Sequence, residues 1–193
     1  PKPAPAQPLP LKINASGFDM ILIRGGEFNM GSEKWAATKP VHTVTVPSFY
    51  LGVAEVTQAQ WQALMGANPS AQPGPDRPVE RVSWLDCQQF IDKLNAKSPG
   101  ARFYLPTESE WEFAARSAAA APYLRGMLGS VWEWTSSDFT VYPYHDHAAA
   151  LKVLRGGSFT DTPDLRDPAF RHWDRPTRRL KWNGFRLARE ARP

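Results

Sequence analysis

The amino-acid sequence predicts an α+β fold in which short helices and strands are joined by extensive ordered loops. Hydrophobic residues make up 42% of the 193 residues and eight residues are Trp, so burial of apolar surface can offset the entropy lost on folding. The 19 Pro and 13 Gly interrupt long regular elements. A chain of this length is typical of one domain with one sizeable core.

The first residues differ in composition from the rest. Proline is frequent in residues 1–10, and no apolar run of the kind found in a signal peptide follows it. Residues 1–17 are therefore predicted to be a Pro-rich linker or N-terminal extension, and residues 18–193 the folded domain. The sequence contains no run of about 18 apolar residues, so no membrane-spanning helix is predicted. These observations leave the compartment unassigned.

Apolar and alternating runs predict strands in the first part of the domain. Residues 20–23 and 27–30 flank Arg24-Gly25-Gly26, which predicts a β-hairpin. Residues 42–46, with the sequence HTVTV, alternate between polar and apolar side chains as a half-buried strand does.

Three helices are predicted by capping boxes, in which a Ser or Thr is followed three residues later by an acidic residue or Gln. Thr57 precedes the first helix, which is expected to end near Gly66; Ser83 and Thr107 precede the second and third. Cys87 lies in the second helix and is expected to be buried. As the single cysteine, it excludes an intrachain disulfide and a multi-thiolate metal site.

Several sequence blocks occur together in a characteristic order. The blocks are residues 55–57, 68–69, 77–79, 82–84, 105–112, 114–116, 129–135, 154–159 and 184–189. Because of these blocks and their order, the chain resembles the formylglycine-generating-enzyme (sulfatase-modifying-factor) superfamily over roughly residues 20 to 190. The resemblance implies a C-type-lectin-like fold.

The same resemblance bears on catalysis. In catalytic members, two cysteines shortly after the Gly-Gly-Ser motif bind copper and act as a redox pair, and here Asp161 and Arg166 occupy those positions. Neither side chain can replace a thiolate, so the formylglycine-generating oxidase chemistry is excluded and no enzymatic activity is expected. The alternative is an oxidase-like enzyme with iron held by His145, Asp146 and His147.

Glu133 matches a calcium-ligand position of the family. Calcium takes six to eight oxygen ligands, which one carboxylate cannot supply. The sequence therefore predicts no cofactor, with calcium at Glu133 as the alternative. Pairing of Glu133 with an arginine or with buried backbone donors is the other interpretation.

Residues 160–183, between the Gly-Gly-Ser and Gly-Phe-Arg blocks, show neither helical nor strand periodicity. Trp and Arg on loops over a rigid scaffold are typical of recognition surfaces, so we predict a binding surface here. Its expected residues are Thr160, Asp161, Thr162, Asp164, Asp167, His172, Trp173, Asp174, Thr177, Arg178, Leu180, Lys181 and Trp182. Burial of Trp173 and Trp182 in the core is the alternative. The supporting frame is expected to include Arg166, Phe170, Arg171 and Arg186.

The chain also resembles the variable proteins of diversity-generating retroelements, whose mutated positions lie in this segment of the same fold. The sequence thus predicts a non-catalytic ligand-binding or protein-interaction module for a protein or other macromolecular ligand. A sensory or adaptor domain of a larger bacterial protein, such as a serine/threonine kinase, is equally consistent. From Lys152 onward there are eleven Lys and Arg against five Asp and Glu, but the interleaved charges favour internal pairing, so nucleic acid is not the expected partner.

Overall fold

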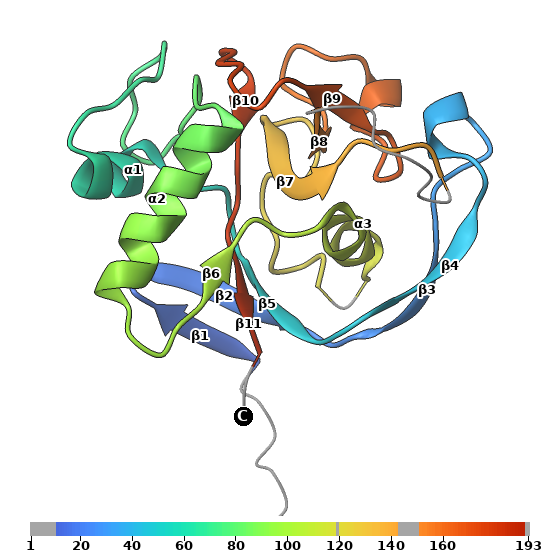
Figure 1. Cartoon of the computed structure of the whole chain (residues 1–193), viewed down its shortest axis with the longest axis horizontal. Helices are drawn as coiled ribbons and strands as arrows, with labels where there is room; N and C mark the ends of the chain where they lie inside the picture. Colours follow the sequence, from blue (N-terminus) through green and yellow to red (C-terminus); the bar gives the residue numbers. More distant parts are fainter. Residues whose placement is uncertain (1–10, 119, 143–150, 192–193) are drawn as a thin grey trace, which may run out of the picture.

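The computed structural model describes residues 11–118, 120–142 and 151–191, and the strands in these ranges form three sheets (Figure 1). The strands are β1 (Lys12–Ala15), β2 (Phe18–Ile23), β3 (Gly26–Met30), β4 (His42–Val46), β5 (Phe49–Gly52), β6 (Phe103–Tyr104), β7 (Trp132–Asp138), β8 (Lys152–Arg155), β9 (His172–Asp174), β10 (Asn183–Gly184) and β11 (Ala188–Glu190). The larger sheet has the order β1-β2-β5-β11-β6, the second β10-β7-β8-β9, and β3 pairs with β4.

The predicted helices are confirmed. They are α1 (Gln58–Met65), α2 (Trp84–Lys97) and α3 (Glu108–Arg116), accompanied by the 3-10 turns η1 (Ala36–Thr38) and η2 (Pro163–Arg166). Each α-helix begins with a reciprocal capping box. The Ser or Thr side chain accepts from the backbone N–H of the third helical residue, whose own side chain accepts from the backbone N–H of the Ser or Thr. Helix α1 is followed by its C-cap, Gly66, whose φ of 90° lies in the left-handed region that glycine adopts without strain.

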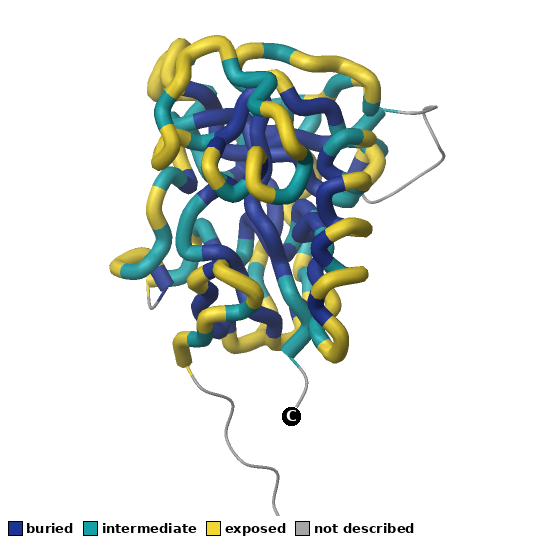
Figure 2. The backbone as a smooth tube through the Cα atoms, turned by 90° about the vertical axis from the view of Figure 1, so that its left-hand side faces the viewer, coloured by how far each residue is buried: buried dark blue, intermediate teal, exposed yellow. Residues whose placement is uncertain are grey.

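The central strands β2 and β5 of the larger sheet have buried residues on both faces. In β2, Met20 and Leu22 belong to a core cluster with α2, whereas Ile21 and Ile23 belong to a second cluster with α3. This alternation follows from the two-residue period of a strand. Helix α2 and helix α3 lie on opposite sides of the sheet in Figure 1, and buried segments run through the interior in Figure 2.

The predicted hairpin around Gly25 is wrong. Strand β2 pairs with β5 and β3 pairs with β4, so residues 18–30 and 42–52 form one long antiparallel ribbon whose turn lies between β3 and β4. At Gly25 the chain passes from one sheet to the next, and a Cβ there would clash with the carbonyl oxygen of Val46. The glycine permits close approach of two backbones rather than a tight turn. The half-buried strand at residues 42–46 is confirmed.

The folded domain begins before residue 18. Strand β1 falls within the predicted linker and pairs with β2 from Lys12 to Ala15. The burial of Cys87 is confirmed, and burial raises the pKa of its thiol well above the usual value. Among the described residues, no helix is both long and apolar enough to cross a bilayer.

Candidate functional site

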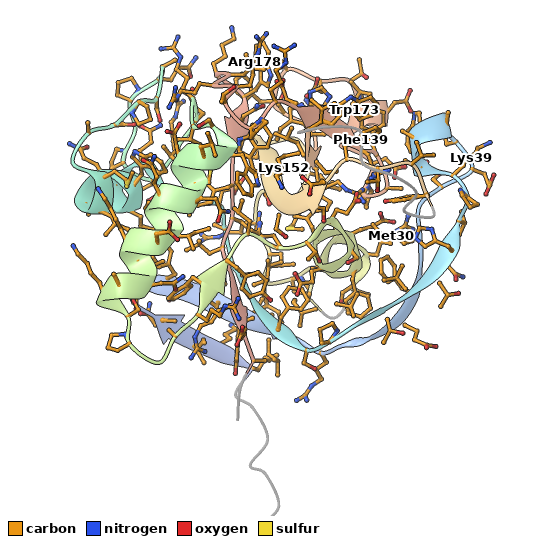
Figure 3. All side chains as sticks on the ribbon, viewed as in Figure 1. Met30, Lys39, Phe139, Lys152, Trp173 and Arg178 are labelled. Carbon is orange, nitrogen blue, oxygen red and sulfur yellow. The ribbon has the colours of Figure 1, made fainter. Side chains whose placement is uncertain are left out.

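The segment predicted to bind a ligand crosses the end of the molecule formed by η2, β9 and the loops around them (Figure 1). Trp173 and Arg178 both lie at this end in Figure 3. None of the thirteen predicted residues is buried. The exposed ones are Thr160, Thr162, Asp164, Trp173, Thr177, Arg178 and Lys181, and the half-buried ones are Asp161, Asp167, His172, Asp174, Leu180 and Trp182.

The two tryptophans of this segment have different environments. Trp173 is 37% exposed and stacks on Phe139, with ring centroids 3.9 Å apart. Trp182 is half-buried and packs against the core cluster of α2. The ring centroids of His172 and Trp132 are 5.0 Å apart, and burial lowers the pKa of the His172 imidazole. The segment therefore presents aromatic area to solvent while part of it is tied to the core.

Arg171 fixes the middle of this segment to the frame. Its guanidinium is buried and donates to both carboxylate oxygens of Glu108 on α3, each at 2.8 Å. It also donates to the carbonyl oxygens of Ala37 at 2.8 Å and Thr140 at 3.0 Å. Five N–H donors in a rigid fork allow one side chain to join these elements.

A second buried arginine supports the same region. Arg155 of β8 donates to Glu112 at 2.8 Å and to the carbonyl oxygens of Pro168 and Phe170 at 2.9 and 3.2 Å. It also contacts Glu108 at 3.3 Å, so two buried cations face two buried carboxylates. Burial without pairing would be costly for each of these charges. Arg155 belongs to the sequence block 154–159, but its burial and its pairing with Glu108 and Glu112 were not predicted.

The positions of the missing cysteines are occupied by side chains with structural contacts. The Asp161 carboxylate accepts from the backbone N–H of Ser158 at 2.6 Å and from its hydroxyl at 2.5 Å. Arg166 donates to the carbonyl oxygen of Phe159 at 3.2 Å. Both side chains thus hold the loop that follows the Gly-Gly-Ser motif.

Glu133 is paired with Arg186, both of them fully buried. The guanidinium contacts the two carboxylate oxygens at 2.8 to 3.2 Å, and Trp111 Nε1 donates to one of them at 2.7 Å. The carbonyl oxygens of Gly52 and Arg125 accept from the same guanidinium at 2.9 and 2.8 Å. The oxygen atoms that could coordinate calcium already face a positive charge, so this arrangement does not fit a calcium ion.

No group of three or more His, Cys, Asp or Glu side chains converges in the part of the chain that the structure describes. The alternative iron ligands His145, Asp146 and His147 lie outside the described residues.

A pocket of about 370 Å³ opens beside the C-terminal segment. Its walls include Gln58 at the start of α1 and Glu80, neither of which was predicted to belong to a site, together with Lys181 of the predicted surface. The pocket was missed because its residues come from segments far apart in the chain, and no short motif marks them.

The chain is similar to curated proteins that carry different names. It is 27% identical to a hercynine oxygenase of Mycolicibacterium smegmatis, with 94% of this chain and 63% of the relative covered. It is also 27% identical to the serine/threonine-protein kinase pkn1 of Chlamydia pneumoniae, covering 89% of this chain and 38% of the kinase. The chain thus spans less than two thirds of the length of these relatives.

The solved structure of Treponema denticola variable protein 1 has the same fold, with a TM-score of 0.79 and 24% identity. The match covers 90% of this chain and 95% of that one. The α+β, C-type-lectin-like architecture expected from the sequence is confirmed by this likeness and by the elements described above.

The oxygenase relatives contradict the prediction that the chain is not an enzyme. Relatives named hercynine oxygenase match 78 to 94% of this chain, so the absence of cysteine at positions 161 and 166 does not exclude catalysis. The family model for the sulfatase-modifying factor enzyme 1-like domain matches residues 7–123 and 120–191. The chain therefore belongs to the sulfatase-modifying factor enzyme 1-like domain family.

Proposed function

We propose that this chain is a ligand-recognition domain that acts as a sensory or adaptor part of a larger bacterial protein. The observation that carries the proposal is the contrast within residues 160–182: the predicted surface residues are all at least partly exposed, while Arg171 in their midst is buried on Glu108. A segment pinned at its centre can vary its outer side chains without loss of the fold.

The relatives support this setting. The kinase from Chlamydia pneumoniae matches this chain over 38% of its own length, which leaves most of that protein for other parts. A fold that occurs in proteins with different additional domains is expected to contribute recognition rather than one fixed chemistry. The expected ligand is a protein or other macromolecule that contacts Trp173 and Arg178.

The test is a capture experiment with matched variants. The immobilised domain is exposed to lysate, the retained proteins are identified by mass spectrometry, and each one is then purified and its affinity measured. Trp173→Ala and Arg178→Ala should weaken binding of the true partner, whereas Arg102→Ala, in the loop before β6 at the opposite end, should not. Equal retention of every partner by all three variants would contradict the proposal.

Diversification of this surface is tested separately by sequencing the locus in sister isolates. Substitutions concentrated in codons 160–183, with a near-identical template repeat nearby, would support a diversified binding protein. An unchanged segment without a template would leave a fixed sensory or adaptor domain.

An oxygenase is the second candidate, favoured by the match to hercynine oxygenase over 94% of this chain. Metal ligands other than thiolates would be required, because Cys87 is the one cysteine and is fully buried. Elemental analysis of purified protein together with oxygen uptake tests this candidate. Absence of a stoichiometric metal and of oxygen uptake would remove it.

A further inference from the structure

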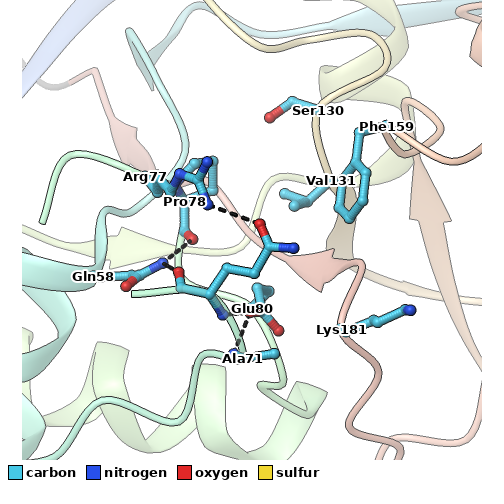
Figure 4. Close-up of a pocket in the computed structure, with 10 residues that line it drawn as sticks. Gln58, Ala71, Arg77, Pro78, Glu80, Ser130, Val131, Phe159 and Lys181 are labelled. Atoms are coloured by element: carbon cyan, nitrogen blue, oxygen red, sulfur yellow. Dashed lines mark hydrogen bonds between the residues drawn. The ribbon is translucent and has the colours of Figure 1, made fainter. Parts of the chain in front are cut away.

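The pocket beside the C-terminal segment is built from three separate parts of the chain (Figure 4). The first is the start of α1 with the loop that follows the helix, the second is the chain just before β7, and the third is the segment around the predicted surface. The residues used below are Gln58, Arg77, Glu80, Val131, Phe159 and Lys181. Figure 4 shows Val131 and Phe159 across the pocket from Glu80.

Glu80 lines this pocket, and one of its two carboxylate oxygens has no hydrogen-bond donor. The residue is 7% exposed, and its Oε1 accepts from the backbone N–H groups of Ala71 and, at 3.3 Å, Gln72. Its Oε2 is buried, and no donor among the described residues reaches it. A carboxylate oxygen can accept two hydrogen bonds, and a buried acceptor without a donor is unfavourable. A bound group with N–H donors would satisfy this oxygen.

The backbone around Glu80 is held in place by other contacts. Gln58, which is 2% exposed, donates to the carbonyl oxygens of Gln72 at 3.0 Å and Pro78 at 3.3 Å. The backbone N–H of Arg81 donates to Leu180 at 3.1 Å, which ties this loop to the C-terminal segment. The carboxylate is therefore positioned before a ligand arrives, which lowers the entropy cost of binding.

The pocket is lined by charged and apolar side chains. Lys181 is exposed and takes part in no ion pair within the described ranges; its ammonium lies 5.6 Å from the ring of Trp182. Arg77 lies at another wall, where its guanidinium donates to Gln72 at 2.8 Å. Phe159 is 51% exposed and offers an apolar contact. A ligand complementary to this pocket carries a cation, an apolar chain and an anion.

We propose that the pocket binds a small zwitterion, with an ammonium or guanidinium group on Glu80 Oε2, an apolar chain against Val131 and Phe159, and a carboxylate beside Lys181. This inference rests on the proposed recognition function and specifies a ligand class for one part of it. This order of cation, apolar chain and anion is found in ω-amino acids and in a lysine residue with a free α-carboxylate, as at the C-terminus of a peptide.

The test uses three probes of equal chain length. 6-Aminohexanoate carries both charges, n-hexylammonium carries the cation alone, and hexanoate carries the anion alone. Calorimetry should show the tightest binding for 6-aminohexanoate, weaker binding for n-hexylammonium and none for hexanoate. Nα-acetyl-lysine methylamide, which presents a side-chain ammonium without a carboxylate, should bind like n-hexylammonium; tighter binding than 6-aminohexanoate would overturn the zwitterion in favour of a peptide side chain.

Variants assign each charge to its residue. Glu80→Gln keeps an oxygen for Ala71 and Gln72 but places an amide donor toward the ligand, so the dissociation constants of both cationic probes should rise at least about tenfold. Glu33→Gln, an exposed control, should bind like the unchanged protein. Lys181→Met should lower the affinity for 6-aminohexanoate to that for n-hexylammonium. The affinity for n-hexylammonium should not fall.

The proposal is overturned if no probe binds, if hexanoate binds as well as 6-aminohexanoate, or if Glu80→Gln leaves both affinities unchanged. Should Glu80→Gln fail to fold, the comparison of 6-aminohexanoate and n-hexylammonium on Lys181→Met still decides the question. Trp173 and Arg178 do not line the pocket. If no probe binds but the Trp173 and Arg178 variants still weaken partner binding, only the zwitterion proposal is rejected. If those variants leave partner binding unchanged, the proposed recognition function is rejected.

Discussion

Replacement of Arg171 by Met should destabilise the domain more than any surface change in residues 160–182. The substitution preserves much of the apolar stem but removes the guanidinium that donates to both oxygens of Glu108 and to the carbonyl oxygens of Ala37 and Thr140. Glu108 keeps Arg155 at 3.3 Å, so its charge is only partly compensated.

Loss of one partner from a buried ion pair costs about 3–5 kcal/mol. For a domain of this size that corresponds to a fall in melting temperature of about 6–20 °C, since about 2–4 °C is lost per kcal/mol. The two carbonyl oxygens left without a donor act in the same direction, although the contributions are not additive.

Urea unfolding followed by tryptophan fluorescence measures this loss, because several of the eight Trp are buried. Arg178→Met is the matched control. Its side chain is 61% exposed and its ion pair with Asp174 is 3.8 Å long, so a change below about 0.5 kcal/mol is expected.

In the Arg171→Met background, Glu108→Gln should recover part of the stability, because it removes the uncompensated charge. If Arg171→Met lowers the free energy of unfolding by less than about 1 kcal/mol, the reasoning is refuted, because an exposed ion pair contributes as much. The segment would then be held by its aromatic contacts rather than by the buried arginine.

Four further predictions concern other parts of the chain. Burial lowers the pKa of His172, so its contribution to stability is present above the unfolded value near 6.5 and is lost as pH falls through and below it; His172→Gln should flatten that part of a stability-against-pH curve. Cys87 should react with a thiol reagent only at the rate of unfolding, and fast labelling of native protein would contradict its burial. Thr57→Ala removes the capping box of α1 and should cost about 1 kcal/mol in urea unfolding, with a change near zero speaking against the cap. Calcium and EDTA should leave the melting temperature unchanged, whereas a rise of several degrees with calcium would show that Glu133 binds it despite Arg186.

Local sequence was sufficient for the helices. Thr57, Ser83 and Thr107 mark the three starts because a capping box is made within four consecutive residues. The ordered blocks around the Gly-Gly-Ser motif were sufficient for the family, which the family model confirms over residues 7–191 in two overlapping matches. The hairpin at Gly25 failed because glycine in a strand region can mark either a turn or a close crossing of two backbones.

The candidate site depended on contacts between distant segments. Sequence indicated that residues 160–182 form an exposed surface, but not that Arg155 and Arg171 would pair with Glu108 and Glu112 across 43 to 63 positions. Nor could it show that Glu80 would line a pocket with one oxygen lacking a donor. Composition, periodicity and caps are properties of neighbouring residues, so the sequence by itself determined the helices and the family. Strand pairing, the pairing of buried charges and the shape of a pocket arise only when distant segments pack, and the tertiary structure alone decided them.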